Sequence, residues 1–372
     1  MDYTMCMFII KIVLMNMNIL IVPDSYKGTL TSVEVAKTIK SVIEKSSDCK
    51  VIALPFADGG EGFSDAMESI CNGKRLYTKC HDIYGKEIDG YITVFDKTAV
   101  VECAVASGLQ QRKNVMQSTS YGTGELIRFA VENGYNNIIL GLGGTGCCDG
   151  GIGALSALGV RLYDENQNIM KMPKSNDMNY IFGISTKDKV KDINFTFACD
   201  VENEFYGKNG AAYIFAPQKG ARKTDVEELD AGLQRLNAFF KTDVSKVKGA
   251  GAAGGICGGL YSVFGGKIKS GFDILSEYSN LEEKIANADI VISGEGKTDE
   301  QTLMGKLPYK ISELCKKHSK KCVVISGSAD DVKIGDLLLT LVDKNTTLEE
   351  ALAHPAEVLA KKVENNLEII LK

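Results

Sequence analysis

The sequence predicts an α/β fold in which a three-layer, Rossmann-like domain with a parallel sheet carries an inserted second α/β domain. Short apolar runs, typical of buried parallel strands, alternate along the chain with segments in which apolar residues recur at helical spacing. Between about residues 76 and 103, short strands follow one another without helices, which indicates an insertion of a different kind. The length of 372 residues also favours two domains over one.

The predicted elements begin with the apolar run 18–22, which ends at Pro23 and predicts a strand. Thr31 and Glu34 then form a capping-box pattern ahead of apolar residues at helical spacing, and this predicts a helix. The same alternation continues along the chain. It predicts further strands at residues 51–54, 138–140, 290–292 and 323–325, and helices at 63–70, at 124–132, from about 152, and at 308–317.

The inserted domain is predicted from its own strands and from the point where the alternation of apolar strands with helices resumes. Strands are expected at residues 76–81, 91–95, 99–103 and 195–199, and a glycine-rich stretch follows at 249–259. The Rossmann-like domain is then discontinuous, with residues 17–80 and 271–372, and the second domain comprises residues 81–270.

Residues 1–16 form a predicted N-terminal extension outside both domains. They contain the apolar run 7–14, interrupted by Lys11, but lack the basic start and the small-residue cleavage site of a signal peptide. The run is also too short to span a bilayer. We therefore expect an extension or a misplaced start ahead of Met15 or Met17.

Composition and charge argue against several classes of function. The 43 Lys and Arg residues against 48 Asp and Glu give a net charge of −5, whereas a nucleic-acid binder requires a basic surface. No stretch of the sequence is apolar enough for a membrane span, so we expect a soluble, cytoplasmic protein without a membrane partner. The 11 cysteines include no C-x-x-C pair and the 3 histidines lack zinc-ligand spacing, which indicates buried thiols in a reducing compartment and no structural zinc.

Four predicted strands run into loops that are rich in glycine and charge, at residues 23–28, 55–62, 141–146 and 293–299. Any one of them is as well explained by an ordinary polar turn, and Asp58 alone by an Asx turn or a helix N-cap. Together, at the carboxyl ends of parallel strands, they favour a ligand site. Phosphoryl transfer fits them, because it needs N–H groups and lysines around phosphates, and carboxylates for magnesium and for a hydroxyl proton.

Two familiar motifs are tested against these loops. The segment 294–298 is similar to a P-loop, but that motif needs a glycine at position 291, where the chain has valine. The segment 141–146 fits G-x-G-x-x-G, which leaves a dinucleotide site open. The acid expected about twenty residues later would be near Asp164, which is not clearly at the end of a second parallel strand, so a phosphate loop without NAD is preferred.

The combination of these segments resembles the bacterial glycerate kinase type 1 family, from Met17 to the C terminus. The resemblance implies phosphorylation of glycerate with ATP and Mg²⁺ on a two-domain α/β fold, with the active site in the interdomain cleft. Tyr26 stands where phenylalanine is commoner in the family. The segments that carry the resemblance, in order, are 23–28, 55–62, 122–124, 141–146, 149–153, 199–203, 251–255 and 294–299.

The roles of single residues are inferred from chemistry. Lys27, Asp58 and Asp200 are assigned to catalysis, with Lys27 on an anion and Asp200 accepting a proton or holding a second metal. Asp58, Glu61 and Asp299 are the candidate magnesium ligands. The other predicted contacts to substrate or nucleotide are Asp24, Ser25, Gly28, Gly59, Gly60, Gly122, Thr123, Gly143, Gly144, Thr145, Glu295 and Lys297. Residues 251–255 are expected to close over the cleft as a lid.

Two other functions stay open beside the kinase. One is an NAD-dependent oxidoreductase of a small hydroxy acid, based on residues 141–146, and the other is a non-catalytic sensor of small anions. The sequence does not decide which hydroxyl of glycerate is phosphorylated, although 2-phosphoglycerate is favoured over 3-phosphoglycerate. It also leaves both a monomer and a homodimer open.

Overall fold

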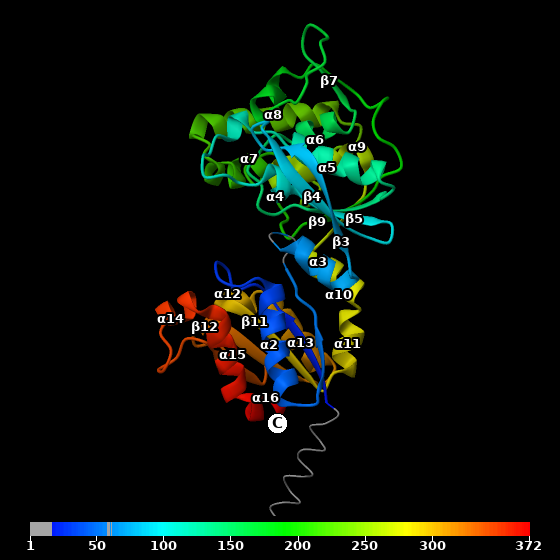
Figure 1. Ribbon diagram of the computed structural model, residues 1–372. Coiled ribbons are helices and arrows are strands. Elements are labelled where there is room, and N and C mark those ends of the chain that lie inside the picture. Colours follow the sequence, from blue (N-terminus) through cyan, green and yellow to red (C-terminus); the bar gives the residue numbers. More distant parts are fainter. Residues whose placement is uncertain (1–16, 58–59, 61) are drawn as a thin grey trace, which may run out of the picture. The chain divides into compact units, whose positions relative to one another are not determined.

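The computed structural model describes residues 17–57, 60 and 62–372, which divide into two compact units (Figure 1). The first unit comprises the described residues up to Ala57, then Ser69–Cys71 and Leu275–Lys372. The second comprises the described residues of 58–68 together with Asn72–Ile274. Each unit is an α/β structure with its own sheet, so the predicted fold class is confirmed.

The first unit is built on a five-stranded sheet in the order β13-β12-β11-β1-β2, in which every pairing is parallel. The strands predicted at 18–22, 51–54, 290–292 and 323–325 are confirmed as four of them, and β13 was not predicted. Their bounds are β1 (Asn18–Pro23), β2 (Lys50–Ala53), β11 (Ile290–Thr298), β12 (Lys321–Ala329) and β13 (Leu337–Thr340).

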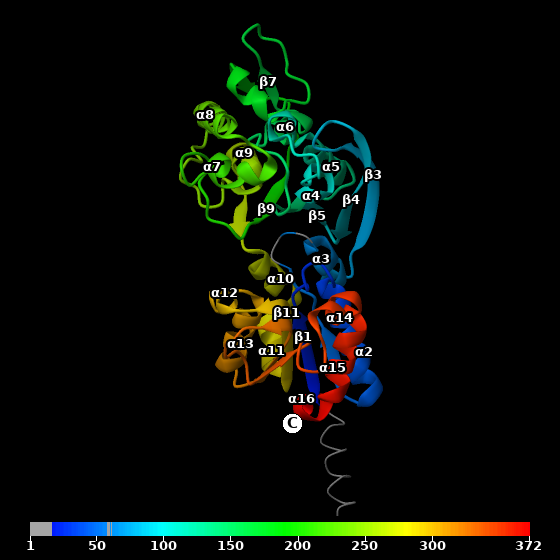
Figure 2. The same cartoon turned by 90° about the vertical axis from the view of Figure 1, so that its left-hand side faces the viewer.

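Helices cover both faces of this sheet, which gives the predicted three layers (Figure 2). On one face lie α2 (Ser32–Ser46) and α15 (Pro355–Asn365), and on the other α11 (Leu281–Asn287) and α13 (Leu307–Lys317). The capping box at Thr31 that starts α2 is present. The unit is completed by α12 (Glu300–Leu303), α14 (Leu348–Ala353) and α16 (Leu367–Leu371). Two further helices, α3 (Phe63–Cys71) and α10 (Gly271–Ser279), contain residues of both units.

The second unit is built on a six-stranded sheet in the order β10-β9-β6-β5-β4-β3. The four strands β5, β6, β9 and β10 are parallel, while β3 and β4 extend the sheet as an antiparallel hairpin. Their bounds are β3 (Lys74–His81), β4 (Glu87–Phe95), β5 (Thr98–Glu102), β6 (Asn137–Gly141), β9 (Asn194–Ala198) and β10 (Lys267–Lys269). A separate two-stranded sheet pairs β7 (Arg161–Tyr163) with β8 (Gly183–Ser185).

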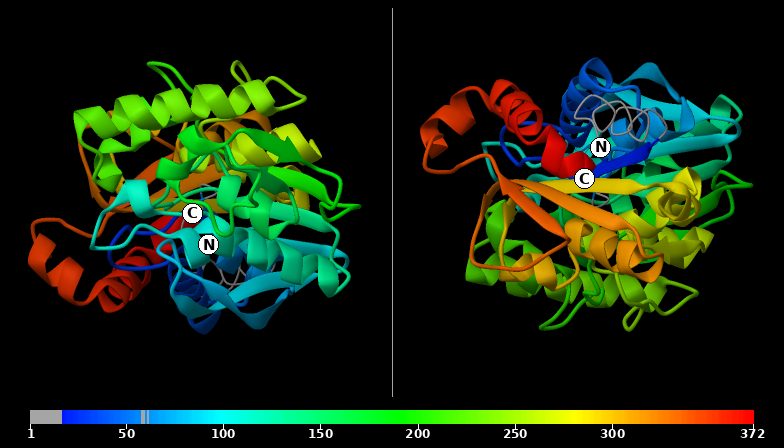
Figure 3. Two further views of the ribbon diagram at one scale, coloured as in Figure 1. Left: turned by 90° about the horizontal axis from the view of Figure 1, so that it is seen from above. Right: turned by 90° about the horizontal axis from the view of Figure 1, so that it is seen from below.

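Helices α5 (Tyr121–Glu132), α6 (Ile152–Ala157) and α9 (Ile256–Phe264) pack on the six-stranded sheet around one apolar core. A second core lies further out, around α7 (Ala211–Phe215) and the long helix α8 (Lys223–Phe239), which Figure 3 (left) shows at the periphery of the unit. The short helix α4 (Cys103–Ser107) follows β5 directly.

Within residues 17–57, 60 and 62–372, no helix is both long and apolar enough to cross a bilayer. The cysteines described are all free, and all but Cys71 are buried.

The predicted domain boundary near residue 80 differs from the structure. A boundary between residues 80 and 81 would cut the strand expected at residues 76–81, whereas β3 pairs with β4 along its whole length, from Lys74 to His81. The reason is a tight turn in which the N–H of Asp82 donates to the carbonyl oxygen of Lys86 at 2.8 Å, so the two strands form one hairpin. β3 therefore belongs to the second sheet.

Residues 251–255, predicted as a lid, are part of the packed interior. Gly254 and Gly255 are buried and have positive φ angles of 67° and 88°. A Cβ at Gly254 would collide with the carbonyl oxygen of Cys147, and one at Gly251 with that of Glu204. The glycines here permit close packing of backbone on backbone, which a segment that opens and closes would lose.

Candidate active site

The loop after β1 is held against the carboxyl ends of β11 and β12. The N–H of Asp24 donates to the carbonyl oxygen of Gly294 at 2.9 Å, and the hydroxyl of Tyr26 donates to the carbonyl oxygen of Ile325 at 2.7 Å. Burial raises the pKa of Tyr26, and the nearby charge of Glu295 raises it further, so the phenol stays protonated as a donor. The hydroxyl by which tyrosine differs from phenylalanine therefore fastens this loop to β12.

Lys27 lies at the exposed tip of a tight turn in this loop. The turn is closed by the N–H of Tyr26, which donates to the carbonyl oxygen of Leu30 at 2.8 Å. Gly28 has a φ of +82° with no atom near the position of a Cβ, so glycine is needed for its backbone conformation rather than for space. Lys27 and Gly28 are both exposed, and Ser25 is half-buried. The arrangement presents a lysine and the backbone of a glycine to solvent at the carboxyl end of β1, and the role of Lys27 stays a prediction.

The segment that is similar to a P-loop is extended backbone inside strand β11, not a loop after the strand, and only the four-residue helix α12 follows it. Its glycines serve close packing: a Cβ at Gly294 would collide with the carbonyl oxygen of Ile325, and one at Gly327 of β12 with that of Gly296. The rejection of a P-loop at residues 294–298 therefore agrees with the structure.

Glu295 is a buried carboxylate near the end of β11. Its Oε1 accepts hydrogen bonds from the hydroxyls of Thr302 at 2.6 Å and Thr298 at 3.1 Å, and Lys306 Nζ lies 3.9 Å from Oε2. Burial raises the pKa of Glu295, although the two hydroxyls and Lys306 oppose it. Thr302 and Lys306 were missed because they follow the predicted loop, in α12 and beyond it, where no motif marks them.

Asp299 caps a helix rather than standing open to a ligand. Its carboxylate accepts from the N–H groups of Gln301 and Thr302 at the start of α12, and Lys306 Nζ lies 3.6 Å away. Burial opposes ionisation, but the charge of Lys306 and the two N–H groups outweigh it, so the pKa of Asp299 is lowered. Lys297 forms an exposed ion pair with Asp330 at 3.1 Å.

The acids of this first cluster fit magnesium poorly in the arrangement described. Glu295 and Asp299 converge on the ammonium group of Lys306, which takes the position of a cation between them. In the part of the chain that the structure describes, no group of three His, Cys, Asp or Glu residues could hold a metal ion. Asp58 and Glu61, the other predicted magnesium ligands, lie outside the described residues, as does Gly59.

The second unit has a comparable cluster at the carboxyl ends of its parallel strands. Glu102, the last residue of β5, is buried and accepts the N–H of Ser64 at 2.8 Å. Burial raises the pKa of Glu102 to about 7, against the opposing N–H groups of Ser64 and Phe63 at the start of α3. Gly60 lies just before this helix, and its carbonyl oxygen accepts the N–H of Phe63 at 3.2 Å. The end of the predicted loop 55–62 is therefore fastened to β5 through Glu102, which no motif indicated.

Asp200 follows strand β9 of the same sheet, in which β6 lies between β9 and β5. It is exposed, and both of its carboxylate oxygens lie 3.3 Å from the N–H of Gly271 at the start of α10. Because β5, β6 and β9 are parallel neighbours, Asp200, Glu102 and the loop after β6 share one edge of the sheet.

The glycine-rich loop after β6 does not have the geometry of a dinucleotide site. That fingerprint requires the loop to open a helix directly, but α6 begins only at Ile152, behind a turn in which buried Asp149 binds the N–H groups of Gly151 and Gly153. Asp164 follows β7, which belongs to the separate antiparallel sheet. The geometry of this loop therefore does not support an NAD site, and its role as a phosphate loop stays a prediction.

Gly122 and Thr123 are placed in the packed core of the second unit. The hydroxyls of Thr123 and Ser107 lie 2.7 Å apart and both residues are fully buried. A Cβ at Gly122 would collide with the carbonyl oxygen of His81. Packing accounts for both residues, and their role as ligand contacts stays a prediction.

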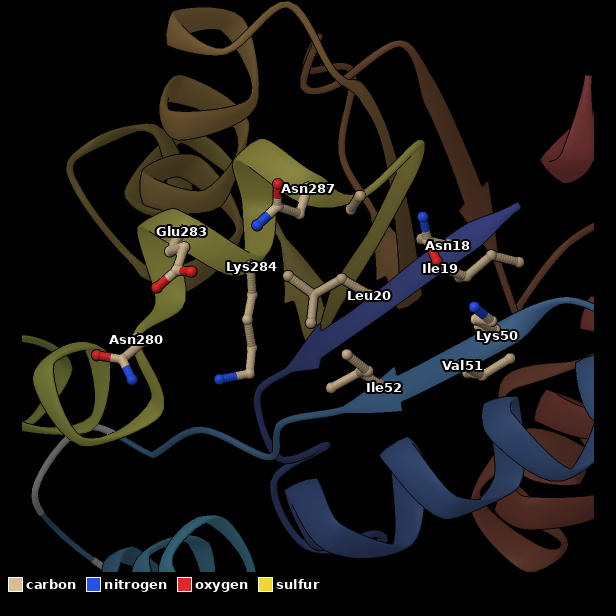
Figure 4. Close-up of a pocket in the computed structure, with 11 residues that line it drawn as sticks. Asn18, Ile19, Leu20, Lys50, Val51, Ile52, Asn280, Glu283, Lys284 and Asn287 are labelled. Carbon is tan, nitrogen blue, oxygen red and sulfur yellow. The ribbon is translucent and has the colours of Figure 1, made fainter. Parts of the chain in front are cut away.

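A pocket of about 530 Å³ lies elsewhere in the first unit (Figure 4). It is open between α11 and the strands β1 and β2, where Leu20, Ile52 and Lys284 line it. No predicted site residue lines this pocket, and it holds few of the acids and glycines that phosphoryl transfer needs. The clusters at the strand ends remain the better candidates.

The fold and these clusters define a class: an α/β protein with charged, glycine-rich loops at the carboxyl ends of parallel strands and without a P-loop. The glycerate kinase family model matches residues 19–371. An Escherichia coli (strain K12) protein named glycerate 2-kinase is 38% identical over 354 residues, which cover 90% of this chain and 93% of the relative. A Bacillus cereus (strain ATCC 10987 / NRS 248) protein named glycerate kinase is 35% identical, with 96% of each chain covered.

A solved structure agrees with these relatives. The crystal structure of a protein assigned as glycerate kinase 2 from Salmonella typhimurium LT2 matches with a TM-score of 0.84 at 34% identity, covering 95% of this chain and 98% of that chain. The chain therefore belongs to the glycerate kinase family, and it is a kinase. The family resemblance seen in the sequence is confirmed.

Proposed function

We propose that this chain phosphorylates D-glycerate with ATP as phosphoryl donor and Mg²⁺ as cofactor, and that the product is 2-phosphoglycerate. The observation that carries the proposal is the family match over residues 19–371, together with 38% identity to a protein named glycerate 2-kinase. A cytoplasmic location fits the free, buried cysteines of the described chain.

The chemistry of the two clusters supports roles for particular residues. Lys27 is an exposed cation at a strand end and would bind a phosphate or the glycerate carboxylate. Asp200 would accept the proton of the attacking hydroxyl, because it lies at the end of β9 with its carboxylate accessible. Acids of this chain would hold Mg²⁺, which when bound would supply positive charge to neutralise the phosphates. Asp58 and Glu61 remain the proposed ligands, while Asp299 is better explained as a helix cap.

An assay of ADP release tests this proposal. The enzyme is mixed with ATP, Mg²⁺ and D-glycerate, and ADP formation is coupled to NADH oxidation. We expect turnover that requires D-glycerate and is absent with 3-hydroxypropanoate, which lacks the C2 hydroxyl that would accept the phosphate. Substrate-dependent reduction of NAD without ATP would support the oxidoreductase instead. Thermal stabilisation by glycerate without any turnover would support the anion sensor.

A further inference from the structure

Lys219 is a buried lysine directly beneath the glycine-rich loop 141–146. It ends the short 3₁₀ helix Pro217–Lys219, and only 3% of its surface is exposed. Its ammonium group donates to the carbonyl oxygen of Cys147 at 2.7 Å and lies 3.4 Å from Oγ1 of Thr145. No motif surrounds Lys219, so its position in the sequence alone does not mark it as a site residue.

The charge of this ammonium group has no carboxylate partner within the described residues. Asp149, two residues after Cys147, is also fully buried. Its carboxylate oxygens accept hydrogen bonds from Ser120, Gly151 and Gly153 instead. An ammonium group can donate three hydrogen bonds, and a buried charge is unfavourable unless an opposite charge pairs with it. Lys219 therefore lacks the anion that would balance it.

The loop above Lys219 presents free donors. The N–H groups of Gly143 and Gly144 donate to no residue in the described chain, whereas the N–H of Gly146 donates to the carbonyl oxygen of Ser107 at 2.8 Å. Gly144 is exposed and has a φ of +71°, a conformation that favours glycine. Adjacent backbone N–H groups next to a fixed positive charge are the elements of an anion-binding site.

We propose that Lys219 supplies the charge of an anion-binding subsite at residues 143–145. The shared chemistry of its ligand is an oxyanion, either the carboxylate of the hydroxy acid or a phosphate of the nucleotide. The identity of those two ligands rests on the proposed function, but the subsite itself does not. Bound anion oxygens accept from the free N–H groups of the loop and balance the buried ammonium.

The competing explanation is that Lys219 only ties the 3₁₀ helix to Cys147. A matched control separates the two, because Lys189 of the same unit also donates to a backbone carbonyl, that of Val263 at 2.7 Å, and is partly buried. Lys189 precedes β9 and so lies at its amino end, away from the loop. Lys189→Met removes a comparable structural contact without touching the proposed subsite.

The experiment measures thermal midpoints of the full chain and its variants against rising D-glycerate, ADP or inorganic phosphate. In Lys219→Met and Lys219→Gln we expect the apparent Kd for at least one probe to rise tenfold or more. The Kd of Lys219→Arg should lie between those of the neutral variants and wild type. Loss of the glycerate response identifies the carboxylate as the ligand, and loss of the ADP response identifies a phosphate. Lys189→Met should bind all three probes as wild type does.

Two results would overturn the subsite. One is unchanged affinity, within twofold of wild type, for every probe in folded Lys219→Met or Lys219→Gln. The other is failure of both neutral variants to fold, which would assign Lys219 to structure. Turnover of wild type is measured separately. If wild type binds phosphate through Lys219 but does not phosphorylate glycerate, the proposed function fails and the subsite stands.

Discussion

Lys27 is the exposed cation of the first cluster, on a turn that its own side chain does not hold together. Lys27→Ala should therefore leave the fold intact and lower kcat/KM by at least roughly a hundredfold, about 2.7 kcal/mol, the scale of one charged contact to the transition state. Steady-state kinetics at varied ATP and glycerate measure this. Lys37→Ala, at an exposed position of α2, is the control. Near-normal kinetics in Lys27→Ala would remove the residue from the site.

Glu102 should make the stability of the protein depend on pH. Its folded pKa of about 7 lies above the unfolded value of about 4.3. The folded state therefore keeps a proton that the unfolded state releases between these values, and stability falls as the pH rises through this window. The full effect is on the order of 3 kcal/mol. Glu102→Gln, which keeps an oxygen acceptor for Ser64, should remove most of this fall.

Urea unfolding at pH 5 and pH 8 measures the effect of Glu102. Wild type should lose more stability between the two pH values than Glu102→Gln does. Glu132→Gln, which changes an exposed carboxylate in the same unit, should behave like wild type. An equal loss in wild type and Glu102→Gln would show that Glu102 titrates normally.

The types of residue at the strand ends could be predicted from the sequence, but their partners could not. Lysine, acid and glycine after an apolar run are visible within ten residues of sequence. The link between Glu102 and Ser64 joins residues 38 positions apart, and that between Lys219 and Cys147 joins residues 72 apart. Only the tertiary fold brings such residues together, with the start of α3 placed at the end of β5 and the 3₁₀ helix Pro217–Lys219 placed at the loop after β6.

Asp299 is the N-cap of helix α12, which begins at Glu300, and variants at this position distinguish a cap from a metal ligand. Asp299→Ala should lower the thermal midpoint because it removes the acceptor for two N–H groups, while Asp299→Asn should retain most of the stability. Neither variant should shift the Mg²⁺ concentration for half-maximal activity by more than about twofold. Titration of activity with Mg²⁺ checks this. A shift of tenfold or more in Asp299→Asn, with stability unchanged, would restore Asp299 as a metal ligand.

Individual helices and strands were predicted well where a short stretch of sequence determines where they begin and end. The apolar runs of β1, β6, β11 and β12 and the capping box of α2 are local signals, and the structure confirms them. The domain boundary at residue 80 and the predicted lid at 251–255 fail for a different reason. A half-buried strand has no sequence mark for the sheet it joins, and glycines that allow movement are the same as glycines that allow close packing.

At the scale of the whole chain, residues 1–16 should be dispensable. The family model begins at residue 19, and no predicted or described site residue precedes Asp24. A chain that starts at Met17 should keep both kcat/KM and its thermal midpoint within error. Parallel purification of both lengths, with kinetics and thermal unfolding, measures this. A clear loss of stability in the shorter chain would show that residues 1–16 contribute to the fold.

The discontinuous architecture was predictable from the sequence. Apolar runs typical of buried parallel strands recur near both ends of the chain, and a different pattern lies between them. The first sheet takes β1 and β2 from residues 18–53 and its other strands from residues 290–340. Each unit then has a cluster of candidate site residues at the ends of its strands. The sequence could not specify the chemistry of these clusters further, because carboxylates that bind metal, cap helices or accept protons look alike.

Phosphorus NMR of a single reaction tests the central claim most directly. The enzyme is incubated with ATP, Mg²⁺ and D-glycerate, and the phosphorus signals are followed until ATP is consumed. The account predicts one new phosphate monoester, whose coupling to a single proton places it on the C2 hydroxyl, formed in equal amount to ADP. Two results would contradict this account. One is the formation of inorganic phosphate as the only new phosphorus species. The other is a rate of ATP loss that is the same with and without glycerate.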